Sequence, residues 1–472
     1  MLNYFPKYFT NKAMYVYFAL LVCVPVIFGY PMEWYFWIFG IVEVVGFFYF
    51  AHQLPIAWQS YTPKAFIKKL FTTALTIRLL YVVFSYWFYN TMTGTPFEFG
   101  AADVEFYNYM GQVGHKCLSE WQFNLLTEFQ RQGGDVALSD SGYPIYLSII
   151  YWLFDDSIFL TRILKSVWSA WTCVLVYKLA SRNFGESVGR MAAIFCMLMP
   201  NFIYYCGIHL KETEMLFLIV LFAERADYAM RAKQLDWKAL ILAILAACIL
   251  FLFRTALAAV AMIALATTLM LSSKKVLSLS KRIAIGTFVV LAMFATVGNQ
   301  LMREAEELLA QSGDNQSTSM QWRSTRKGGN EFAKYAGAAV FAPMIFTIPF
   351  PTLVNTDSQE NQRMIHGGNY VKNITSALTI FALFSLLFSG AWRKHVLILA
   401  IGCGYLIVIA LSAFAHSERF HLPALPFALM LAAYGVSILS NKQKKWYNYW
   451  LMLIFVANIA WAWFKLKGRG LV

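Results

Sequence analysis

The sequence predicts an all-α polytopic membrane protein, and three observations support this prediction. Of its 472 residues, 59% are hydrophobic and only 14% are charged, whereas soluble proteins contain about 25% charged residues. Aromatic residues make up 17% of the chain, and Trp and Tyr often flank the apolar runs, as they do at membrane interfaces. The apolar runs are numerous enough for a helical bundle of about 11–14 spans.

Each long apolar run is a predicted transmembrane helix, because a span needs about 20 apolar residues. We expect about 13 spans, the sixth of which is short and ends at Glu224 and Arg225. They are predicted near Met14–Tyr30, Trp34–Phe50, Phe71–Tyr89, Phe159–Leu179, Met191–Leu210, Met215–Asp227, Leu240–Leu252, Ala256–Leu271, Ile283–Val297, Ala377–Ser389, Val396–Ala413, Leu422–Leu439 and Tyr447–Phe464. The apolar segment Gly142–Phe154 is too short to span, so we expect a helix lying in the outer membrane interface.

The net charge of +14 is spread over short loops between the apolar runs. That distribution sets membrane topology and argues against nucleic acid as a partner. If the spans alternate, the basic loops fall on one side, which the positive-inside rule makes cytoplasmic. The basic tail "KLKGRGLV" is an exception, because an odd number of spans puts it outside. Basic residues precede the first apolar run without a small-residue cleavage site, which predicts an uncleaved signal-anchor.

The domain organisation follows from this topology. Residues 1–472 are predicted to form a single membrane-embedded domain that starts with a helix pair within 1–70. Two larger segments lie outside, namely 90–156 with interfacial helices and 298–375. Within the second, the polar stretch "QSGDNQSTSMQWRSTRKGGN" is predicted to be mobile in part.

The seven cysteines give no sign of a metal site or a disulfide framework. Most of them lie inside apolar runs, where cysteine behaves as a small hydrophobic residue. No CxxC or Cys/His ligand spacing occurs in the sequence. The sequence therefore does not identify a cofactor, and a requirement for a divalent cation stays open.

Charged and titratable residues suited to catalysis or binding are concentrated in the predicted outer turns. The turns are "GAADVEFYNYMG" after the third span, "GIHLKETE", "LFLFRTAL" and "AHSERFHLPALPF". Charged groups at membrane depth are costly and usually face a cavity or a partner, so four such turns on one side suggest a shared site. The candidate residues are Asp103, Glu105, His209, Lys211, Glu212, Arg254, His416, Glu418 and Arg419.

Simpler roles remain open for each candidate. Asp103 could be a solvated loop acid or a helix N-cap, and Glu105 a solvated neighbour. Lys211 and Glu212 could form an ordinary charge pair at a helix start. Arg254 could extend its guanidinium to the membrane interface. The acid and the base of the last turn could be surface charges, and a lone histidine is more often a hydrogen-bonded surface group.

The order of these motifs resembles the GT-C superfamily of integral-membrane glycosyltransferases, in particular the aminoarabinose and protein-mannosyl transferases. The similar run is "SGYPIYLSIIYWLFDDSIFLTRILKSVWSAWTCVLVYKLASRNFGESVGRMAAIFCMLMPNFIYYCGIHLKETEMLFLIVL". It combines an interfacial helix, a span that ends in a short basic turn, a Pro-containing span and a charged outer turn. "SERFHLPALPFALMLAAYG" resembles a later family segment, an acid–Arg–aromatic run before a Pro-rich span. The resemblance covers the core from Arg78 to Val220 and the segment near Glu418.

The resemblance implies a GT-C-like helical fold and a transferase domain. It implies a polyprenyl-phosphate sugar as donor and a glycan, lipid or protein as acceptor, at the extracytoplasmic face of a bacterial inner membrane during cell-envelope assembly. The family's catalytic acid lies in the first large outer loop and matches Asp103. The family often has an adjacent acid pair, whereas Val104 separates Asp103 from Glu105 here. The usual "HPP"-like start of the interfacial helix is "SGYP", without the histidine, and Tyr143 in it is a weaker candidate, as are His209 and His416.

The chemistry that this reading implies is a glycosyl transfer. A carboxylate within hydrogen-bond reach can take the proton of an acceptor hydroxyl as the hydroxyl attacks C1 of the sugar. Lys211, Arg254 and Arg419 are the candidates for holding the departing phosphate, and a single displacement would invert the anomeric centre. A lipid-linked-oligosaccharide flippase or other transporter, and a polysaccharide polymerase or ligase, remain alternatives. Transporters usually place charge near the bilayer midplane with repeat symmetry, and the sequence contains no repeat.

Overall fold

All regular structure in the described part of the chain is helical, which confirms the predicted all-α polytopic class. The computed structural model describes residues 3–100, 102–133, 140–231, 236–271, 286–287, 312–327, 329–355, 359–412 and 414–471. The chain forms two compact units that alternate along the sequence. Unit 1 comprises Met1–Tyr61, Ala180–Asn201 and Thr296–Val472, and unit 2 comprises Thr62–Leu179 and Phe202–Ala295.

Seven helical segments of the described residues are long and apolar enough to cross a membrane. They are α1 (Lys7–Phe28), α2 (Trp34–Ala57), α3 (Pro63–Thr93), α7 (Ile158–Phe184), α17 (His366–Phe388), the segment Glu418–Ser437 and α21 (Gln443–Lys467). The segment Glu418–Ser437 consists of α19 (Glu418–His421), η6 (Leu422–Ala424) and α20 (Leu425–Ser437). Four further apolar helices are shorter, namely α6 (Gly142–Phe154), α11 (Trp237–Phe253), α12 (Thr255–Leu271) and α18 (Val396–Leu411).

Unit 2 begins with α3, whose two ends have clear sequence signals. The Thr62 side chain accepts a hydrogen bond from the backbone N–H of Ala65 at 3.4 Å, and Pro63 occupies the first turn. Proline suits this position because the N–H that it lacks would have no helical partner there. The helix ends at Gly94, which has a φ of 76°, a left-handed conformation that glycine adopts without strain. The predicted outer loop follows directly.

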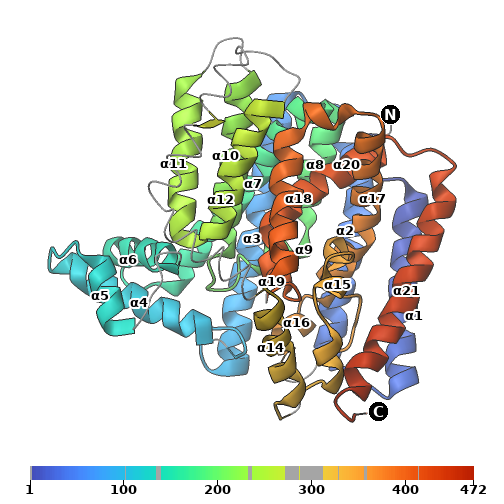
Figure 1. Ribbon diagram of the computed structural model, residues 1–472, viewed down its shortest axis with the longest axis horizontal. Coiled ribbons are helices and arrows are strands. Elements are labelled where there is room, and N and C mark those ends of the chain that lie inside the picture. Colours follow the sequence, from blue (N-terminus) through green and yellow to red (C-terminus); the bar gives the residue numbers. More distant parts are fainter. Residues whose placement is uncertain are drawn as a thin grey trace. The chain divides into compact units, whose positions relative to one another are not determined.

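That loop contains three helices, which include the predicted interfacial helix α6. The other two are α4 (Ala102–Ser119) and α5 (Leu125–Gly133), and α4 packs along α6 (Figure 1). The contact is close because α4 presents glycines to it. A Cβ on Gly111 would lie 2.9 Å from side-chain atoms of Leu147 and Tyr151, so a larger residue there would push the two helices apart.

A helical group of unit 2 surrounds the predicted turn at Arg254. Helix α10 (Glu212–Arg231) packs against α11 and α12, and α11 also contacts α6 (Figure 1). These contacts place the ends of α6, α10, α11 and α12 within one part of unit 2. The candidate residues at those ends can therefore act on one another.

The predicted span Met191–Leu210 is wrong as one continuous helix. Its residues form α8 (Glu186–Leu198), the short α9 (Pro200–Tyr204) and a non-helical stretch that reaches residue 210. The break lies at Met199, which is extended with φ −62° and ψ 114°. Proline disfavours the helical conformation in the residue before it, so Pro200 both ends α8 and begins α9.

In unit 1, α2 and α17 pack closely, and polar groups join them. The backbone N–H of Gly368 donates to the Glu43 carboxylate at 2.9 Å. The Tyr17 hydroxyl, from α1, lies 3.2 Å from Nδ1 of His366. Helix α1 also lies beside α21 (Figure 1), and α17 packs against α20, where Gly435 faces the backbone of Leu378.

The remaining described elements of unit 1 are short. They are α14 (Ser312–Thr325), η2 (Glu331–Tyr335), α15 (Ala338–Phe341), η3 (Ile345–Thr347), α16 (Glu360–Arg363) and η5 (Ala391–Lys394). The polar stretch that we predicted to be mobile in part contains the helix α14. The predicted span Ile283–Val297 lies outside the described residues apart from two positions, and no structure is assigned to it.

Candidate functional site

Asp103 and Glu105 lie in the first turn of α4. The first turn of a helix favours acidic side chains because the unpaired N–H groups there carry partial positive charge. Both side chains are exposed, and Val104 between them is buried. Because residues four apart share one helix face, Asp103 lies one turn from Tyr107. The acid is thus held on a rigid element and remains accessible.

Lys211 is a buried cation near this helix. Its side chain is only 4% exposed, and its ammonium forms an ion pair with Asp140 and donates to the carbonyl oxygen of Phe253 at 2.9 Å. It also lies 5.8 Å from the centroid of the Tyr107 ring. Burial lowers the pKa of Lys211, Asp140 opposes that shift, and Arg254 reinforces it by repulsion. The ion pair with Asp140 spans 71 residues of sequence.

Arg254 connects α11 to α12 in an extended conformation, with φ −165° and ψ 105°. Its backbone N–H closes the last turn of α11 by donating to Leu250 at 2.8 Å, and its side chain is half-buried. Its repulsion of Lys211 means that two cations of unit 2 lie within electrostatic range of each other. Glu212, in the first turn of α10, is buried and favours the charged form of Lys211.

Tyr143 and His209 lie in the packed interior behind Tyr107. The Tyr107 and Tyr143 rings meet edge to face at 5.3 Å, and the Tyr143 and His209 rings at 5.8 Å. His209 is fully buried, with its Nε2 3.2 Å from the hydroxyl of Tyr151. Burial, reinforced by the cations of Lys165 and Arg162, lowers the pKa of His209 well below its usual value. A neutral imidazole in this position supports the packing and is poorly placed to meet a substrate.

Sequence reasoning missed several buried charged residues in unit 2, among them Glu98, Arg162 and Lys165. These three residues are at most 5% exposed. Lys165 donates to the carbonyl oxygens of Ile208, at 2.8 Å, and Leu210, and it lies 3.8 Å from the Glu214 carboxylate. It therefore fixes the non-helical stretch that precedes Lys211. The signal was present in the sequence, since "TRILKS" places two bases inside a predicted span, where charges are rarely tolerated without a role.

Arg162 and Glu98 are buried groups of opposite charge that interact electrostatically. Arg162 donates to the carbonyl oxygen of Pro96 at 2.5 Å. Its Nε and Nη1 atoms have no hydrogen-bond partner among the described residues. Burial raises the pKa of Glu98, and Arg162 partly offsets the shift. Buried polar atoms without partners usually indicate an ordered water or a ligand.

The predicted residues of the last turn lie in unit 1. Glu418 begins α19, is 8% exposed and interacts electrostatically with Lys372 and Lys465. The Arg419 guanidinium lies 5.3 Å from the Phe420 ring centroid. His416 lines a cavity of unit 1. The structure thus brings Lys211, Glu212 and Arg254 together in unit 2, whereas the site shared by all four turns stays a prediction.

No group of three or more His, Cys, Asp or Glu is placed to hold a metal ion in the described ranges. The acid at position 135 of the first outer segment lies outside those ranges. The arrangement offers an accessible carboxylate on a helix start and cations within the same unit. Those groups suit proton removal and the binding of an anionic leaving group.

Seven helical segments of the described residues are long and apolar enough to cross a membrane, as expected of an integral membrane protein. Two family models match the chain, and no curated protein matches it. Residues 142–298 match the Dolichyl-phosphate-mannose-protein mannosyltransferase family, and residues 362–466 match the Alg9-like mannosyltransferase family. The two matches together place the chain in the GT-C superfamily of membrane glycosyltransferases. They support the use of a lipid-linked sugar donor.

Proposed function

We propose that this glycosyltransferase moves a sugar from a polyprenyl-phosphate carrier to an acceptor at the extracytoplasmic membrane face. The acceptor is a glycan, lipid or protein of the bacterial cell envelope, and the enzyme resides in the inner membrane. Residues 1–472 act as a single transferase domain in this proposal. The observation that carries it is Asp103, an exposed carboxylate in the first turn of α4, one helical turn from the ring that approaches Lys211.

In the proposed reaction, Asp103 acts as the general base. The acceptor hydroxyl oxygen attacks C1 of the sugar while the carboxylate takes the hydroxyl proton. The bond between C1 and the phosphate oxygen breaks, and its electron pair leaves with the polyprenyl phosphate. A single displacement inverts the anomeric centre. Asp103 then returns the proton to water, so that the enzyme ends in its starting state.

The leaving phosphate needs a cation more than a proton donor, because it departs as a stable anion. Arg254 is the leading candidate in unit 2, since its guanidinium can present two N–H groups to phosphate oxygens. Lys211 is already neutralised by Asp140 and therefore orients the site or contributes only when that pair opens. Glu418 and Arg419 remain proposed substrate-binding residues of unit 1, and Glu105 remains the alternative base.

Release of polyprenyl phosphate by purified protein tests the proposal. The enzyme is incubated with a polyprenyl-phosphate sugar and a mixture of envelope acceptors, and the lipid products are measured by mass spectrometry. We expect acceptor-dependent release of polyprenyl phosphate. Translocation of an intact lipid-linked sugar across vesicles, without any release, would instead support the flippase alternative. Release coupled to growth of a long glycan chain would indicate a polymerase.

The proposed face can be tested separately by cysteine labelling. Cysteines introduced at Lys64, Lys274 and Lys444 should react only from the cytoplasmic side, and those at Asp103, Lys211 and Glu418 only from the outside. Cysteines introduced at Gly142 and Phe154 test the prediction that α6 lies in the outer interface and does not span the membrane. Labelling of these two positions from opposite sides would show that α6 spans the membrane, and the predicted outer site would fail.

A further inference from the structure

Several lysines gather where α1 and α21 begin, and no acid balances their charge. Both helices belong to unit 1 and pack against each other. The lysines are Lys7 and Lys12 on α1, Lys444 and Lys445 on α21, and Lys442 just before α21. None of them forms an ion pair within the described ranges. Neither helix has an acidic residue in its first turn, so this end of the helix pair is strongly positive.

Tyr8 holds two of these cations close together. The Lys12 ammonium donates to the Tyr8 hydroxyl and to the side-chain oxygen of Asn448, both at 3.0 Å. The Tyr8 hydroxyl donates to the same oxygen at 3.1 Å. The ammonium groups of Lys12 and Lys444 lie 4.5 Å and 5.5 Å from the centroid of the Tyr8 ring. Only neutral oxygens and one ring offset their repulsion, so an anion beside them would be stabilised.

Hydrogen-bond donors remain available for such an anion. An ammonium has three N–H donors, and Lys12 uses two of them within the described part of the chain. Asn448 accepts both of its hydrogen bonds on its oxygen, which leaves its amide N–H groups for another acceptor. Lys7 and Lys444 are exposed, so they can also approach it. A phosphate group has enough oxygens to accept from several of these donors.

The neighbouring apolar residues indicate that the phosphate belongs to a lipid. Trp446 and Tyr449 of α21 are 72% and 64% exposed, and their ring centroids are 6.1 Å apart. Exposed Trp and Tyr at the end of a membrane span lie at the level of the lipid headgroups. Further along the same helix, Met452, Leu453 and Val456 are exposed as well, as expected of a surface that meets acyl chains. A soluble anion would contact the lysines and none of these side chains.

We propose that this lysine cluster binds the headgroup phosphate of an anionic glycerophospholipid, with Lys12 and Lys444 as its main ligands. The positive-inside rule puts the cluster in the cytoplasmic leaflet, where anionic lipids attract basic residues next to a span. The bound lipid would join the first and last helices of the chain, which meet here through Lys12 and Asn448, 436 residues apart.

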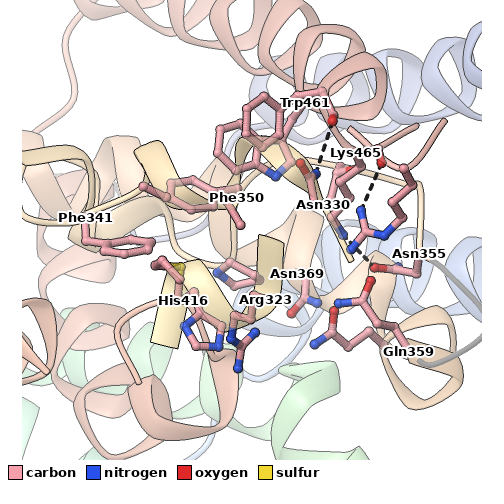
Figure 2. A pocket seen from close by; sticks show the side chains of 18 of the residues that line it. Arg323, Asn330, Phe341, Phe350, Asn355, Gln359, Asn369, His416, Trp461 and Lys465 are labelled. Carbon is pink, nitrogen blue, oxygen red and sulfur yellow. Dashed lines mark hydrogen bonds between the residues drawn. The ribbon is translucent and has the colours of Figure 1, made fainter. Parts of the chain in front are cut away.

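The proposal goes beyond the transfer reaction, because this lipid stays bound and is not consumed. It concerns the face opposite the one proposed for the transfer reaction. The site is also separate from the cavity of unit 1 shown in Figure 2. That cavity takes Lys465 and Trp461 from the other end of α21.

Native mass spectrometry of the full chain in detergent tests the proposal, with phosphatidylglycerol as the probe and zwitterionic phosphatidylcholine as the comparison. We expect the chain to retain phosphatidylglycerol in preference to phosphatidylcholine. Lys12→Gln and Lys444→Gln should each weaken the retention roughly 10-fold, as expected for a lost charged hydrogen bond. Lys68→Gln is the matched control, because it removes the same charge from an exposed position near the start of α3. It should retain the lipid as the unchanged protein does.

Thermal unfolding in the same detergent provides a second measurement. Phosphatidylglycerol should raise the melting temperature of the unchanged protein and of Lys68→Gln, and raise that of the two cluster variants much less. Inorganic phosphate, the soluble comparison, should leave it unchanged. Without lipid, Lys444→Gln should melt at or above the temperature of the unchanged protein, because repulsion is relieved. A lost response to lipid in that variant is then not a folding defect.

Any of four results would overturn the proposal. The first is equal retention of the two lipids, and the second is a loss in Lys68→Gln as large as in the cluster variants, which would indicate a general attraction of basic surfaces. The third is a melting shift with inorganic phosphate that equals the shift with lipid. The fourth is displacement of phosphatidylglycerol by a lower concentration of a polyprenyl phosphate, which would assign the cluster to the carrier lipid. No sugar donor or acceptor is present, so these failures are distinct from a failed transferase assay.

Discussion

The two units treat their buried cations in opposite ways. In unit 2, Lys211 is neutralised by Asp140, and Lys165 is satisfied by two carbonyl oxygens and faces Glu214. In unit 1, Arg323 and Arg469 line a cavity without any acidic partner among the described residues. A cation that the fold has already paired mainly fixes geometry, whereas an unpaired one is available to a ligand. Charge alone therefore does not identify a binding residue.

The predictions below test this contrast between the buried cations of the two units. It also changes which of the candidates found in the sequence we expect to bind the donor phosphate. Lys211 is less suited to bind phosphate because Asp140 already neutralises it, and Arg254 is a candidate because a guanidinium can present paired N–H groups to phosphate oxygens. The cations of the unit 1 cavity were not candidates at all before the structure was known.

The largest expected effect is that of Asp103→Asn on turnover. Asparagine keeps the shape of the side chain and most of its hydrogen bonding, but it cannot take a proton as a carboxylate does. Turnover should fall by about 10²- to 10⁴-fold, the usual range for a lost general base, while donor binding persists. Glu105→Gln is the matched control, one residue beyond Val104 on the same helix, and should lose much less. If instead Glu105→Gln lost turnover and Asp103→Asn kept it, Glu105 would be the base. If both variants kept full turnover, neither acid of α4 would be the base.

The next largest effect concerns the stability of unit 2. Lys165→Met keeps the apolar volume but leaves the carbonyl oxygens of Ile208 and Leu210 and the carboxylate of Glu214 without their donor. Breaking a buried charged pair costs about 3–5 kcal/mol, so the free energy of unfolding should fall by about 3 kcal/mol or more. Unfolding in a denaturing detergent measures it.

Lys116→Met provides the control for that measurement. Lys116 is exposed near the end of α4, and its replacement should change the free energy of unfolding by less than about 0.5 kcal/mol. If Lys165→Met were as mild as this control, the buried cations of unit 2 would not be structural, and the contrast with unit 1 would disappear.

A smaller effect concerns the neighbouring cations Lys211 and Arg254. Arg254→Ala should weaken donor binding by about 2 kcal/mol, or roughly 30-fold, and Arg254→Lys should restore only part, because lysine is a point charge. Asp140→Asn should strengthen donor binding, since it frees Lys211. Titration of a fluorescent polyprenyl-phosphate sugar measures all three. If Arg254→Ala kept its affinity for the donor and Arg419→Ala lost most of it, the donor phosphate would bind in unit 1 instead.

Much of the fold could be predicted from the sequence because apolar runs and helix signals are local. Thr62 and Pro63 begin α3, and Gly94 ends it, as their conformational preferences require. The break at Met199 was also local, since a proline follows it, but hydropathy averaged over the run concealed it. Helix boundaries are therefore predictable where a residue type forces them.

The partnerships of charged residues could not be predicted in the same way. Asp140 and Lys211 are 71 residues apart, and the cavity of unit 1 joins residues from Met320 to Arg469. Such pairs depend on which helix ends the packing brings together, and a single sequence does not contain that information. Arg162 and Lys165 were detectable as costly residues within an apolar run, but their role as supports for a neighbouring stretch required the structure.

The smallest effect is a dependence of stability on pH through His209. Burial and the cations of Lys165 and Arg162 depress the folded-state pKa of this imidazole well below its usual value, which is about 6.5 in an unfolded chain. A group with a depressed pKa contributes stability above its unfolded pKa and loses it as the pH falls toward the folded value. The melting temperature should therefore fall between about pH 7.5 and about pH 5, and the fall should be shallower in His209→Gln, which offers Tyr151 a hydrogen-bonding amide. His115→Gln is the control, because that half-exposed ring contacts Asp156 at 2.7 Å instead of a buried core. If the melting temperature fell equally steeply with pH in the unchanged protein and in His209→Gln, the acid sensitivity would arise from other groups. The buried core around Tyr143 would then tolerate a charged imidazole beside two cations.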